Sequence, residues 1–370
     1  MQQTIEYPDC DVGARSAAEA KGRDWVKALA PYREPRLRRS LVELVVTAVP
    51  FVTLWLAMLL SLRYSYWLCL LLAVPAAGSL VRLFMIQHDC GHGSFFRRRR
   101  ANDWLGRLLG VLTLTPYGYW RRTHAMHHAT SGHLDRRGTG DIDTLTVHEY
   151  QSLPAWRRAR YRLKRHPIVV LGLGPFYLFV LQHRLPVQLM RAGWDPWFSV
   201  MSTNLAIAVV VGLLVAILGV RNFLLVQAPI TLLASSAGVW LFYVQHQFED
   251  TYWERGADWN LHTSALHGSS HYDLPAVLRW FTANIGIHHV HHLASRIPCY
   301  RLDEALRAHP QLQNVSRLTL KESFRCLRLA LWDEDKRRLV RFREARASRV
   351  SGPRNDRVRA PSSASLGAAG

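Results

Sequence analysis

The sequence has few acidic residues and few cysteines, and each shortage argues against a class of site. It contains 27 aspartates and glutamates against 47 lysines and arginines, so its formal net charge is +20. The carboxylates form no dense set of the kind that magnesium and calcium require. The five cysteines include no Cys-x2-Cys pair, which argues against structural zinc and favours reduced thiols facing the cytosol.

Charge is absent altogether from four long stretches, and these exclude a purely soluble protein. The stretches come in two pairs, and a single arginine, Arg63 or Arg221, separates the members of each pair. About 20 apolar residues are enough for a helix to cross the hydrocarbon core of a membrane. We therefore predict an all-α membrane protein with four transmembrane helices in two hairpins, at about residues 44–62, 64–86, 196–220 and 222–245.

Basic residues flank the two predicted hairpins on one side only. Arg33 to Arg39 precede the first helix, Arg97 to Arg100 follow the second, and Arg157 to Arg165 precede the third. Because positively charged loops stay in the cytosol, both chain ends and the segment between the hairpins are expected on the cytosolic side. The positive charge then suits anionic membrane lipids and an acidic electron carrier, and a nucleic-acid partner is rejected. No signal-peptide pattern opens the chain, so residues 44–62 are expected to remain as an anchor.

Two further apolar stretches are too short or too interrupted to span a membrane. Residues 104–120 contain Arg107, and residues 168–182 contain two glycines and a proline. Both are expected to lie along the cytosolic membrane surface as interfacial or re-entrant helices, within a cytosolic helical cap that carries the histidine clusters described next. The expected division is a cytosolic N-terminal segment, a membrane domain, a cytosolic helical segment and a disordered tail, at 1–40, 41–303, 304–347 and 348–370.

Three tight histidine clusters are the most informative feature of the sequence. The first reads His-x3-His, and the second and third both read His-x2-His-His. Such spacings put imidazoles on one face of a helix, and adjacent histidines point about 100° apart, so one cluster can serve two metal ions. The pattern predicts a dinuclear metal site more naturally than a mononuclear one, with no catalytic residue beyond the metals. The predicted ligands are His88, His92, His124, His127, His128, His288, His291 and His292.

The surroundings of these clusters indicate the kind of metal. Neutral nitrogen ligands suit zinc, iron, copper and nickel. The first and third clusters follow predicted membrane crossings, where a lipid chain can enter between helices and reach the metals. Activating an unstrained C–H bond calls for dioxygen and a redox metal, because no side-chain base removes such a proton. Iron that acts on a hydrocarbon is therefore the preferred interpretation.

The three histidine boxes, with four spans divided two and two around them, resemble those of the integral-membrane fatty acid desaturases. The phrases Gln87–Gly93, Arg136–Asp141 and Asn284–His288 are similar to those of bacterial members of the acyl-lipid, delta-12-like branch. The resemblance covers about residues 41–303. It implies that the eight box histidines bind two iron ions, and that His246, at the end of the fourth crossing, is a ninth ligand.

The resemblance also implies a reaction. Two iron ions and O2, with two electrons from outside, are expected to introduce a cis double bond into a fatty acyl lipid and to release water. The enzyme is expected in the bacterial inner membrane, with its termini and active site on the cytoplasmic side. The segments outside the membrane domain are too short for a haem-binding electron carrier, so a ferredoxin or similar donor is expected to act in trans.

Residues near the boxes have a functional and an ordinary interpretation. Asn284 either acts through a water or forms a cap or turn, and His289 is expected behind the ligands. Phe242 stands where some animal desaturases have an asparagine, so the remaining coordination positions stay open. Four carboxylates either accept the second N–H of liganded imidazoles or form solvated surface: Asp89, Asp141, Glu249 and Asp250.

Six aromatic residues and eight isolated histidines complete the candidates. The aromatic side chains either line a narrow acyl channel or serve as packing and interfacial residues. They are Trp104, Tyr117, Trp120, Trp240, Phe242 and Tyr243. The isolated histidines, which are not expected to bind metal, are His133, His148, His166, His183, His262, His267, His271 and His309.

Three other functions compete with desaturation. A diiron hydroxylase of an alkane, acyl or carotenoid substrate uses the same kind of site, and sequence separates the two poorly. An intramembrane zinc protease is less favoured, because Asp89 replaces the glutamate of His-Glu-x-x-His and the other two boxes then have no purpose. A metal carrier is also less favoured, because the four uncharged stretches contain no histidine or carboxylate at mid-depth.

Overall fold

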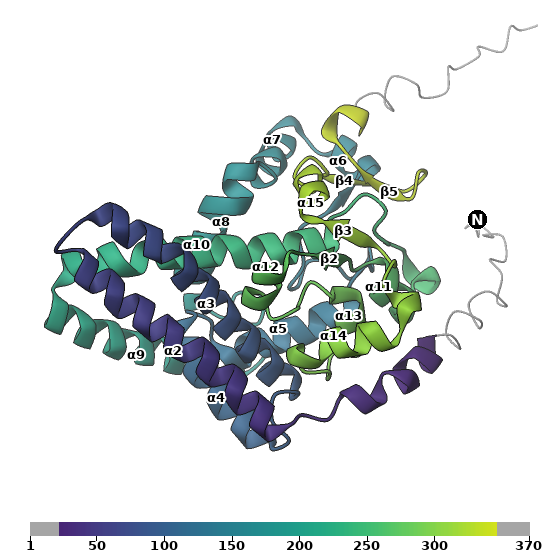
Figure 1. Ribbon diagram of the computed structural model, residues 1–370. Helices are drawn as coiled ribbons and strands as arrows, with labels where there is room; N and C mark the ends of the chain where they lie inside the picture. Colours follow the sequence, from purple (N-terminus) through teal and green to yellow (C-terminus); the bar gives the residue numbers. More distant parts are fainter. Residues whose placement is uncertain (1–21, 346–370) are drawn as a thin grey trace, which may run out of the picture.

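Four long helices form one end of the molecule, and shorter elements form a cap at the other (Figure 1). The computed structural model describes residues 22–345. The long helices are α2 (Leu37–Ser61), α3 (Tyr66–His92), α9 (Trp194–Leu218) and α10 (Val220–His246), and all four are long and apolar enough to cross a membrane. The four predicted crossings and their pairing into two hairpins are confirmed.

The helix α3 is the central helix of the bundle. It packs against α2, α10 and α4, and 61% of its most apolar window is buried, against 11% for α9. The Ser65 hydroxyl accepts a hydrogen bond from the Trp67 N–H and caps the start of α3. At the other end Gly93 adopts φ +67°, a left-handed conformation that ends helices and that glycine adopts without strain. This stop places the first histidine box on the last turns of a membrane helix.

The predicted interfacial stretch at 104–120 is divided between two helices, α4 (Arg99–Leu112) and α5 (Tyr117–Thr130). The division has a local cause, because Leu114 adopts φ +55° and Pro116 precedes the first residue of α5. The second stretch, at 168–182, is helical with π-type turns: η2 (Val169–Leu173), α8 (Gly174–Phe176) and η3 (Tyr177–Leu181), followed by η4 (Gln182–Arg184). It bends by 58° from α7 (Ala155–Lys164), a geometry compatible with a broken span or a re-entrant segment.

The rest of the cap consists of short helices and two small sheets. The helices are α6 (Val147–Ser152), α11 (Leu261–His267), α12 (Ala276–Phe281), α13 (His288–Leu293), α14 (Cys299–Ala308) and α15 (Leu320–Cys326), with single turns η1 (Ala30–Tyr32), η5 (Gly256–Asp258) and η6 (Pro310–Leu312). In the first sheet, β1 (Leu145–Thr146) pairs in parallel with β4 (Leu331–Asp333), which pairs antiparallel with β5 (Arg338–Val340). In the second, β2 (His271–Asp273) pairs in parallel with β3 (Arg317–Thr319).

The segment 304–347, predicted to be helical, contains the end of α14 and all of α15, but it also contains β3, β4 and β5. Each strand has only three residues, too few for an alternating pattern to be recognised in the sequence. The sheets depend on partners far away in the chain, because β1 and β2 precede them by more than forty residues. The predicted disordered tail at 348–370 lies outside the described residues.

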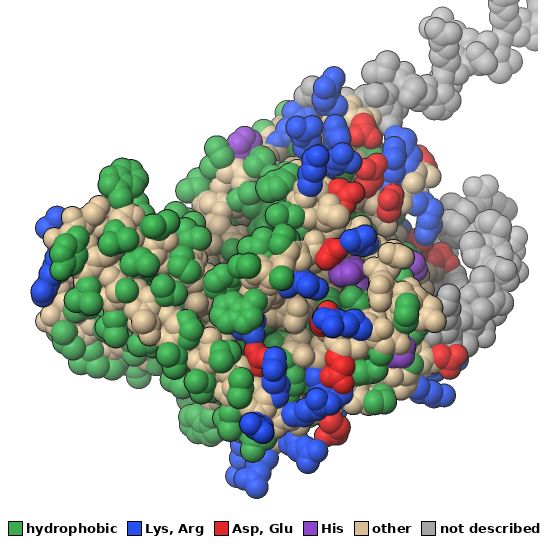
Figure 2. All heavy atoms as spheres, viewed as in Figure 1, with side chains coloured by type: hydrophobic (Ala, Val, Ile, Leu, Met, Phe, Trp, Pro, Cys, Tyr) green, Lys and Arg blue, Asp and Glu red, His purple; other side chains and the backbone are tan. Residues whose placement is uncertain are grey.

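Apolar surface and charge are separated along the molecule. Figure 2 shows hydrophobic side chains over the end made by the long helices, whereas arginines, lysines and acidic residues gather mainly around the cap. Large apolar side chains on α2 and α9 are exposed, including Val49 at 57% and Leu213 at 60%. A soluble protein rarely exposes an apolar surface of this extent, so these faces are suited to lipid.

A buried ion pair joins two membrane helices to the cap. The Arg82 guanidinium on α3 pairs with the Glu43 carboxylate on α2, and both side chains are less than a tenth exposed. Arg82 also donates to the Thr47 hydroxyl at 3.0 Å and lies 4.5 Å from the centre of the Trp280 ring on α12. Buried charges need such partners, so this cluster fixes α2, α3 and α12 relative to one another.

Candidate metal centre

Nine histidines from four helices converge where the membrane helices meet the cap. His88 and His92 lie on the last turns of α3, and His246 is the last residue of α10. The second box lies on α5 and the third box is on α13. The structure thus brings together all eight predicted box histidines and His246.

The nine side chains form two groups, each with its candidate ligand atoms within 4.8 Å of one another. The first group, called the five-histidine group here, consists of His88, His92, His124, His128 and His291. The second, the four-histidine group, consists of His127, His246, His288 and His292. Adjacent residues of the second and third boxes fall into different groups, as expected for neighbours that point about 100° apart on a helix. The geometry suits two metal ions that share two boxes.

The nitrogen contacts within each group have the geometry expected around a shared metal ion and not that of hydrogen bonds. His124 Nε2 lies 3.1 Å from the Nε2 atoms of His88, His92 and His128. One imidazole nitrogen carries one proton or one lone pair, so it cannot make three such hydrogen bonds. Two nitrogens that bind one ion at about 2.1 Å and at right angles to each other lie about 3.0 Å apart. The spacing therefore fits lone pairs directed at a common cation.

The four-histidine group has the same geometry. His246 Nε2 lies 3.0 Å from His288 Nε2 and 3.2 Å from His127 Nε2. Neither group contains a cysteine or a carboxylate among the described residues. A set of nitrogen donors alone suits iron, zinc, copper or nickel and does not suit magnesium or calcium.

Several histidines of α5 and α13 are kept in the neutral form that binds metal. The pKa is held well below the ordinary histidine value, first by burial and second by neighbouring imidazoles, in His124, His128, His288, His291 and His292. Neutral imidazoles present a lone pair at neutral pH, so no proton has to be displaced before a metal binds.

Two of the nine histidines, His127 and His246, have a close protein partner on their second ring nitrogen. His127 Nδ1 contacts the buried carboxylate of Asp141. His246 Nδ1 lies 3.0 Å from the Gly268 carbonyl oxygen, which can only accept, so Nδ1 carries the proton and Nε2 keeps its lone pair. Such partners orient a ligand ring, and a carboxylate also raises its basicity.

The other three proposed carboxylates serve different purposes. Asp89 accepts a hydrogen bond from the Cys299 backbone N–H at 2.7 Å, at the start of α14, and its other oxygen lies 3.6 Å from His88 Nδ1. Glu249 pairs with Arg338, and Asp250 is exposed. Asp89 thus links the first box to the cap and is not placed as the free general base of a zinc protease.

The remaining histidines lie outside both groups in the described part of the chain. His289 turns away from the metal groups and donates from Nε2 to the Leu312 carbonyl at 2.8 Å, and burial lowers its pKa to about 3. Asn284 adopts φ +60° in the turn that follows α12, in line with the turn interpretation. The isolated histidines that take no part in either group are His133, His148, His166, His183, His262, His267, His271 and His309.

Two of the six candidate aromatic residues contact the ligands. Trp120 stacks on His124 at 4.5 Å between ring centres, and Phe242 lies 5.0 Å from His127. Trp104 is exposed. Three others form structural hydrogen bonds or packing contacts elsewhere: Tyr117, Trp240 and Tyr243.

Sequence reasoning missed a buried polar cluster behind His246. The next residue, Gln247, is fully buried, exchanges hydrogen bonds with the Thr144 side chain, and accepts from Arg165 Nη2 at 2.6 Å. Arg165 is buried over the Tyr243 ring, although it belongs to the basic run that precedes the third crossing. The one sequence signal for the burial of Arg165 is that it follows Tyr161 by four residues, so the two side chains share one face of a helix.

The sequence is similar to those of known proteins of one family. The sequence model of a family described as "Fatty acid desaturase" matches residues 62–321. A Bacillus subtilis protein named "Fatty acid desaturase" is 46% identical over 90% of this chain and 94% of its own length. A Synechocystis "sn-1 oleoyl-lipid 12-desaturase" is 27% identical over 66% of this chain and 69% of its own length. A Synechocystis "sn-1 acyl-lipid omega-3 desaturase (ferredoxin)" is 31% identical over 61% of this chain and 63% of its own length.

Proposed function

Because the chain belongs to the fatty acid desaturase family, we propose that it is an O2-dependent diiron enzyme that introduces a cis double bond into the acyl chain of a membrane lipid. The observation that carries the proposal is the pair of histidine groups, which lies at the cap ends of apolar helices. Two redox metals held by neutral imidazoles beside a hydrocarbon environment suit the oxidation of unactivated methylenes.

The proposed ligands are the nine histidines of the two groups, one iron ion to each group. Bound iron supplies the oxidising power that removes two hydrogens while O2 and two external electrons, with two protons, become water. Iron is preferred to zinc because the reaction of the family is an oxidation, and zinc has no accessible redox change.

The protein's own part in the reaction is to hold one carbon–carbon bond beside the metals. Trp120 and Phe242 cover the ligands with apolar rings from two sides, and Phe84 packs on Trp120 at 5.4 Å between ring centres. These rings exclude water and narrow the space, which favours a single alignment of a flexible chain.

The substrate form and the position of the double bond rest on the relatives. The 12-desaturase and omega-3 desaturase of Synechocystis carry acyl-lipid names, and we propose an acyl-lipid substrate with delta-12-like position for this chain. We place the enzyme in a bacterial inner membrane, with its metal centre on the cytoplasmic side, because basic residues gather on the cap.

Electrons are proposed to come from a small acidic carrier such as a ferredoxin. The name of the Synechocystis omega-3 relative includes ferredoxin, and the cap of this chain offers a basic surface. Association of opposite charges weakens as salt screens them, so turnover with the donor should fall as ionic strength rises. A rate that does not change with salt would contradict this pairing.

Expression in a bacterial host that makes no polyunsaturated lipids tests the function. Fatty acids are profiled by mass spectrometry, with the double bond located by derivatisation. A new diene is expected with the wild-type chain and not with His127→Ala, whereas the exposed His166→Ala should behave as wild type. Unchanged lipids despite normal membrane expression would refute the proposal, and a hydroxylated acid in place of the diene would favour the hydroxylase.

A further inference from the structure

Two apolar cavities lie in series inside the helical bundle. The inner chamber has a volume of about 40 Å³ and lies between α3, α10 and the turn that joins α4 to α5. The outer cleft has a volume of about 450 Å³ and lies between α2, α9 and α10. Leu112, Leu114 and Thr231 line both cavities, so the two meet at these side chains.

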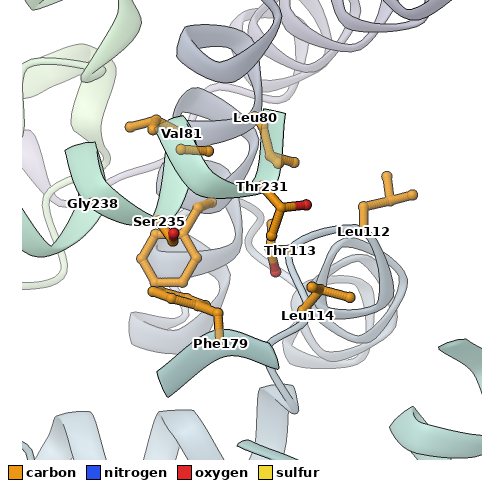
Figure 3. A pocket seen from close by; sticks show the side chains of 11 residues that line it. Leu80, Val81, Leu112, Thr113, Leu114, Phe179, Thr231, Ser235 and Gly238 are labelled. Atoms are coloured by element: carbon orange, nitrogen blue, oxygen red, sulfur yellow. The ribbon is translucent and has the colours of Figure 1, made fainter. Parts of the chain in front are cut away.

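The inner chamber ends at the wall of the metal centre. Phe84 lines it from α3, one helical turn before His88, and packs on Trp120, which stacks on His124. On α10 the chamber reaches Gly238, about two turns before His246. Figure 3 shows Gly238, Thr231 and Ser235 along α10, with Phe179, Leu114 and Leu112 around the same space.

The outer cleft extends away from the metal centre, toward the part of the bundle that is expected in the membrane. Its walls include Phe223 and Leu224, which lie in the first turn and a half of α10, far from His246 at the other end. The two cavities together therefore run from the far end of the helical bundle to Phe84, one helical turn before His88.

The polar side chains that line the inner chamber all form hydrogen bonds within the protein. The Thr113 hydroxyl donates to the Gln87 side chain at 2.6 Å, and the Ser235 hydroxyl donates to the Leu232 carbonyl at 3.1 Å. The Thr231 hydroxyl accepts from the Gln227 side chain at 3.1 Å. The other lining side chains are aliphatic or aromatic, apart from Gly238, so the chamber suits a hydrocarbon chain.

We propose that the inner chamber holds the methyl end of the acyl substrate, and that Leu114 stops that end and so sets which carbon–carbon bond lies beside the metals. The inference rests on the proposed function and adds to it the residue that determines position. A flexible hydrocarbon chain has no polar group along its length by which one methylene could be recognised. A fixed contact with the end of the chain is therefore the simplest way to hold one bond, among near-identical methylenes, beside the metals.

The backbone at Leu114 is held in a conformation that leucine rarely adopts. Its φ of +55° lies in the left-handed region, which is disfavoured for side chains other than glycine, asparagine and aspartate. Arg184 Nη2 donates to the Leu114 carbonyl, and Arg184 Nη1 donates to Asn204 Oδ1 at 2.8 Å. The turn is therefore fixed to η4 and α9, and the side chain of Leu114 is fixed at the junction of the two cavities.

The stop predicts the direction of each change in product. A smaller side chain at 114 lets the methyl end pass toward the outer cleft, so the double bond moves toward the carboxyl end. A larger side chain in the inner chamber keeps the methyl end nearer the metals, so the bond moves toward the methyl end or longer chains are refused. Gly238 suits the second change, because an added Cβ would meet no atom within 4 Å.

The test compares Leu114→Ala and Gly238→Leu with the wild type in the same lipid-deficient host. Double-bond position and accepted chain length are measured by mass spectrometry, and iron per chain is measured on purified protein. Gly212→Leu is the matched control, since Gly212 lies exposed on α9 and also has open space at its Cβ. Leu114→Ala should shift the bond by one or more carbons, Gly238→Leu should shift it the other way or reduce turnover of long chains at least tenfold, and the control should do neither.

The outcomes separate this inference from the proposed function. If both variants keep wild-type iron and form the wild-type product from the wild-type range of chains, Leu114 is not the stop, and the desaturase proposal stands. If the wild type forms no alkene from any chain, the proposed function fails and the inference fails with it. Should Leu114→Ala not accumulate in the membrane, Leu114→Val tests the stop with a smaller truncation. Gly238→Leu still tests whether the methyl end occupies the chamber, because its Cβ would meet no atom within 4 Å.

Discussion

Replacing Asp141 with asparagine should weaken metal binding in one group and leave the fold intact. The carboxylate contacts Nδ1 of His127, and both side chains are 5% exposed or less. Asparagine keeps the shape and one acceptor oxygen but removes the negative charge that raises the basicity of the ring. Loss of such a partner typically costs 10- to 100-fold in metal affinity, or about 1.4 to 2.7 kcal/mol.

The assay is dialysis of the purified, iron-loaded protein against increasing concentrations of a chelator, followed by measurement of the iron that remains. His127 belongs to the four-histidine group, so about half of the iron should leave Asp141→Asn at a 10- to 100-fold lower chelator concentration, and the other half should follow the wild-type curve. Asp250→Asn is the matched control, because Asp250 is exposed and follows His246 by four residues. Coincident curves for the wild type and Asp141→Asn, or equal shifts in both variants, would refute the reasoning.

Three further predictions concern a ligand, a buried charge and a close backbone approach. His246→Ala should reduce bound iron from about two ions per chain to about one by elemental analysis, whereas His289→Ala should keep both, since His289 lies outside the groups. Arg82→Leu leaves the buried Glu43 carboxylate with the half-exposed Arg39 as its one remaining ion-pair partner among the described residues, and should lower the free energy of unfolding by about 3 kcal/mol, the lower end of the range for a broken buried pair, in a denaturing-detergent titration; an unchanged midpoint would contradict the role of the pair. Gly286→Ala would bring a Cβ to 2.3 Å from the Tyr272 carbonyl oxygen just before the third box. The yield of folded, iron-loaded protein, measured by size-exclusion chromatography, should therefore fall several-fold. Gly172→Ala, whose Cβ would meet open space, should leave that yield unchanged.

The membrane helices and the box histidines could be predicted because their signals are local. One signal is an uncharged run of sufficient length, and the other is a set of histidines spaced three or four residues apart. Each depends only on the geometry of one helix. The predicted crossings matched the observed helices to within a few residues at most ends, but α3 continues six residues past the predicted 64–86 and α2 begins seven residues before the predicted 44–62. Those ends were missed because polar residues extend a helix when the cap contacts them.

The polar environment of the histidines could not be predicted in the same way. Asp141 and Asp89 looked equivalent in sequence, yet Asp141 closely contacts the His127 ring, whereas Asp89 accepts its hydrogen bond from the start of α14 and lies 3.6 Å from the His88 ring. Arg165 could not be distinguished from the exposed arginines around it until tertiary contacts enclosed it between Tyr161 and Tyr243. The short strands of the C-terminal segment were missed for a related reason, since each is formed by pairing with a distant partner.

The arrangement of neighbouring histidines on α5 and α13 has a consequence for the spacing of the two proposed metal ions. On each of these helices, two adjacent histidines belong to different groups. The separation of the two groups is therefore fixed by single helical turns, which are among the stiffest units of a polypeptide. The ligands on α3 and α10 belong instead to helices that must adapt to the thickness of the bilayer. A change in lipid composition would then strain the histidines on α3 and α10 before it altered the gap between the two proposed ions.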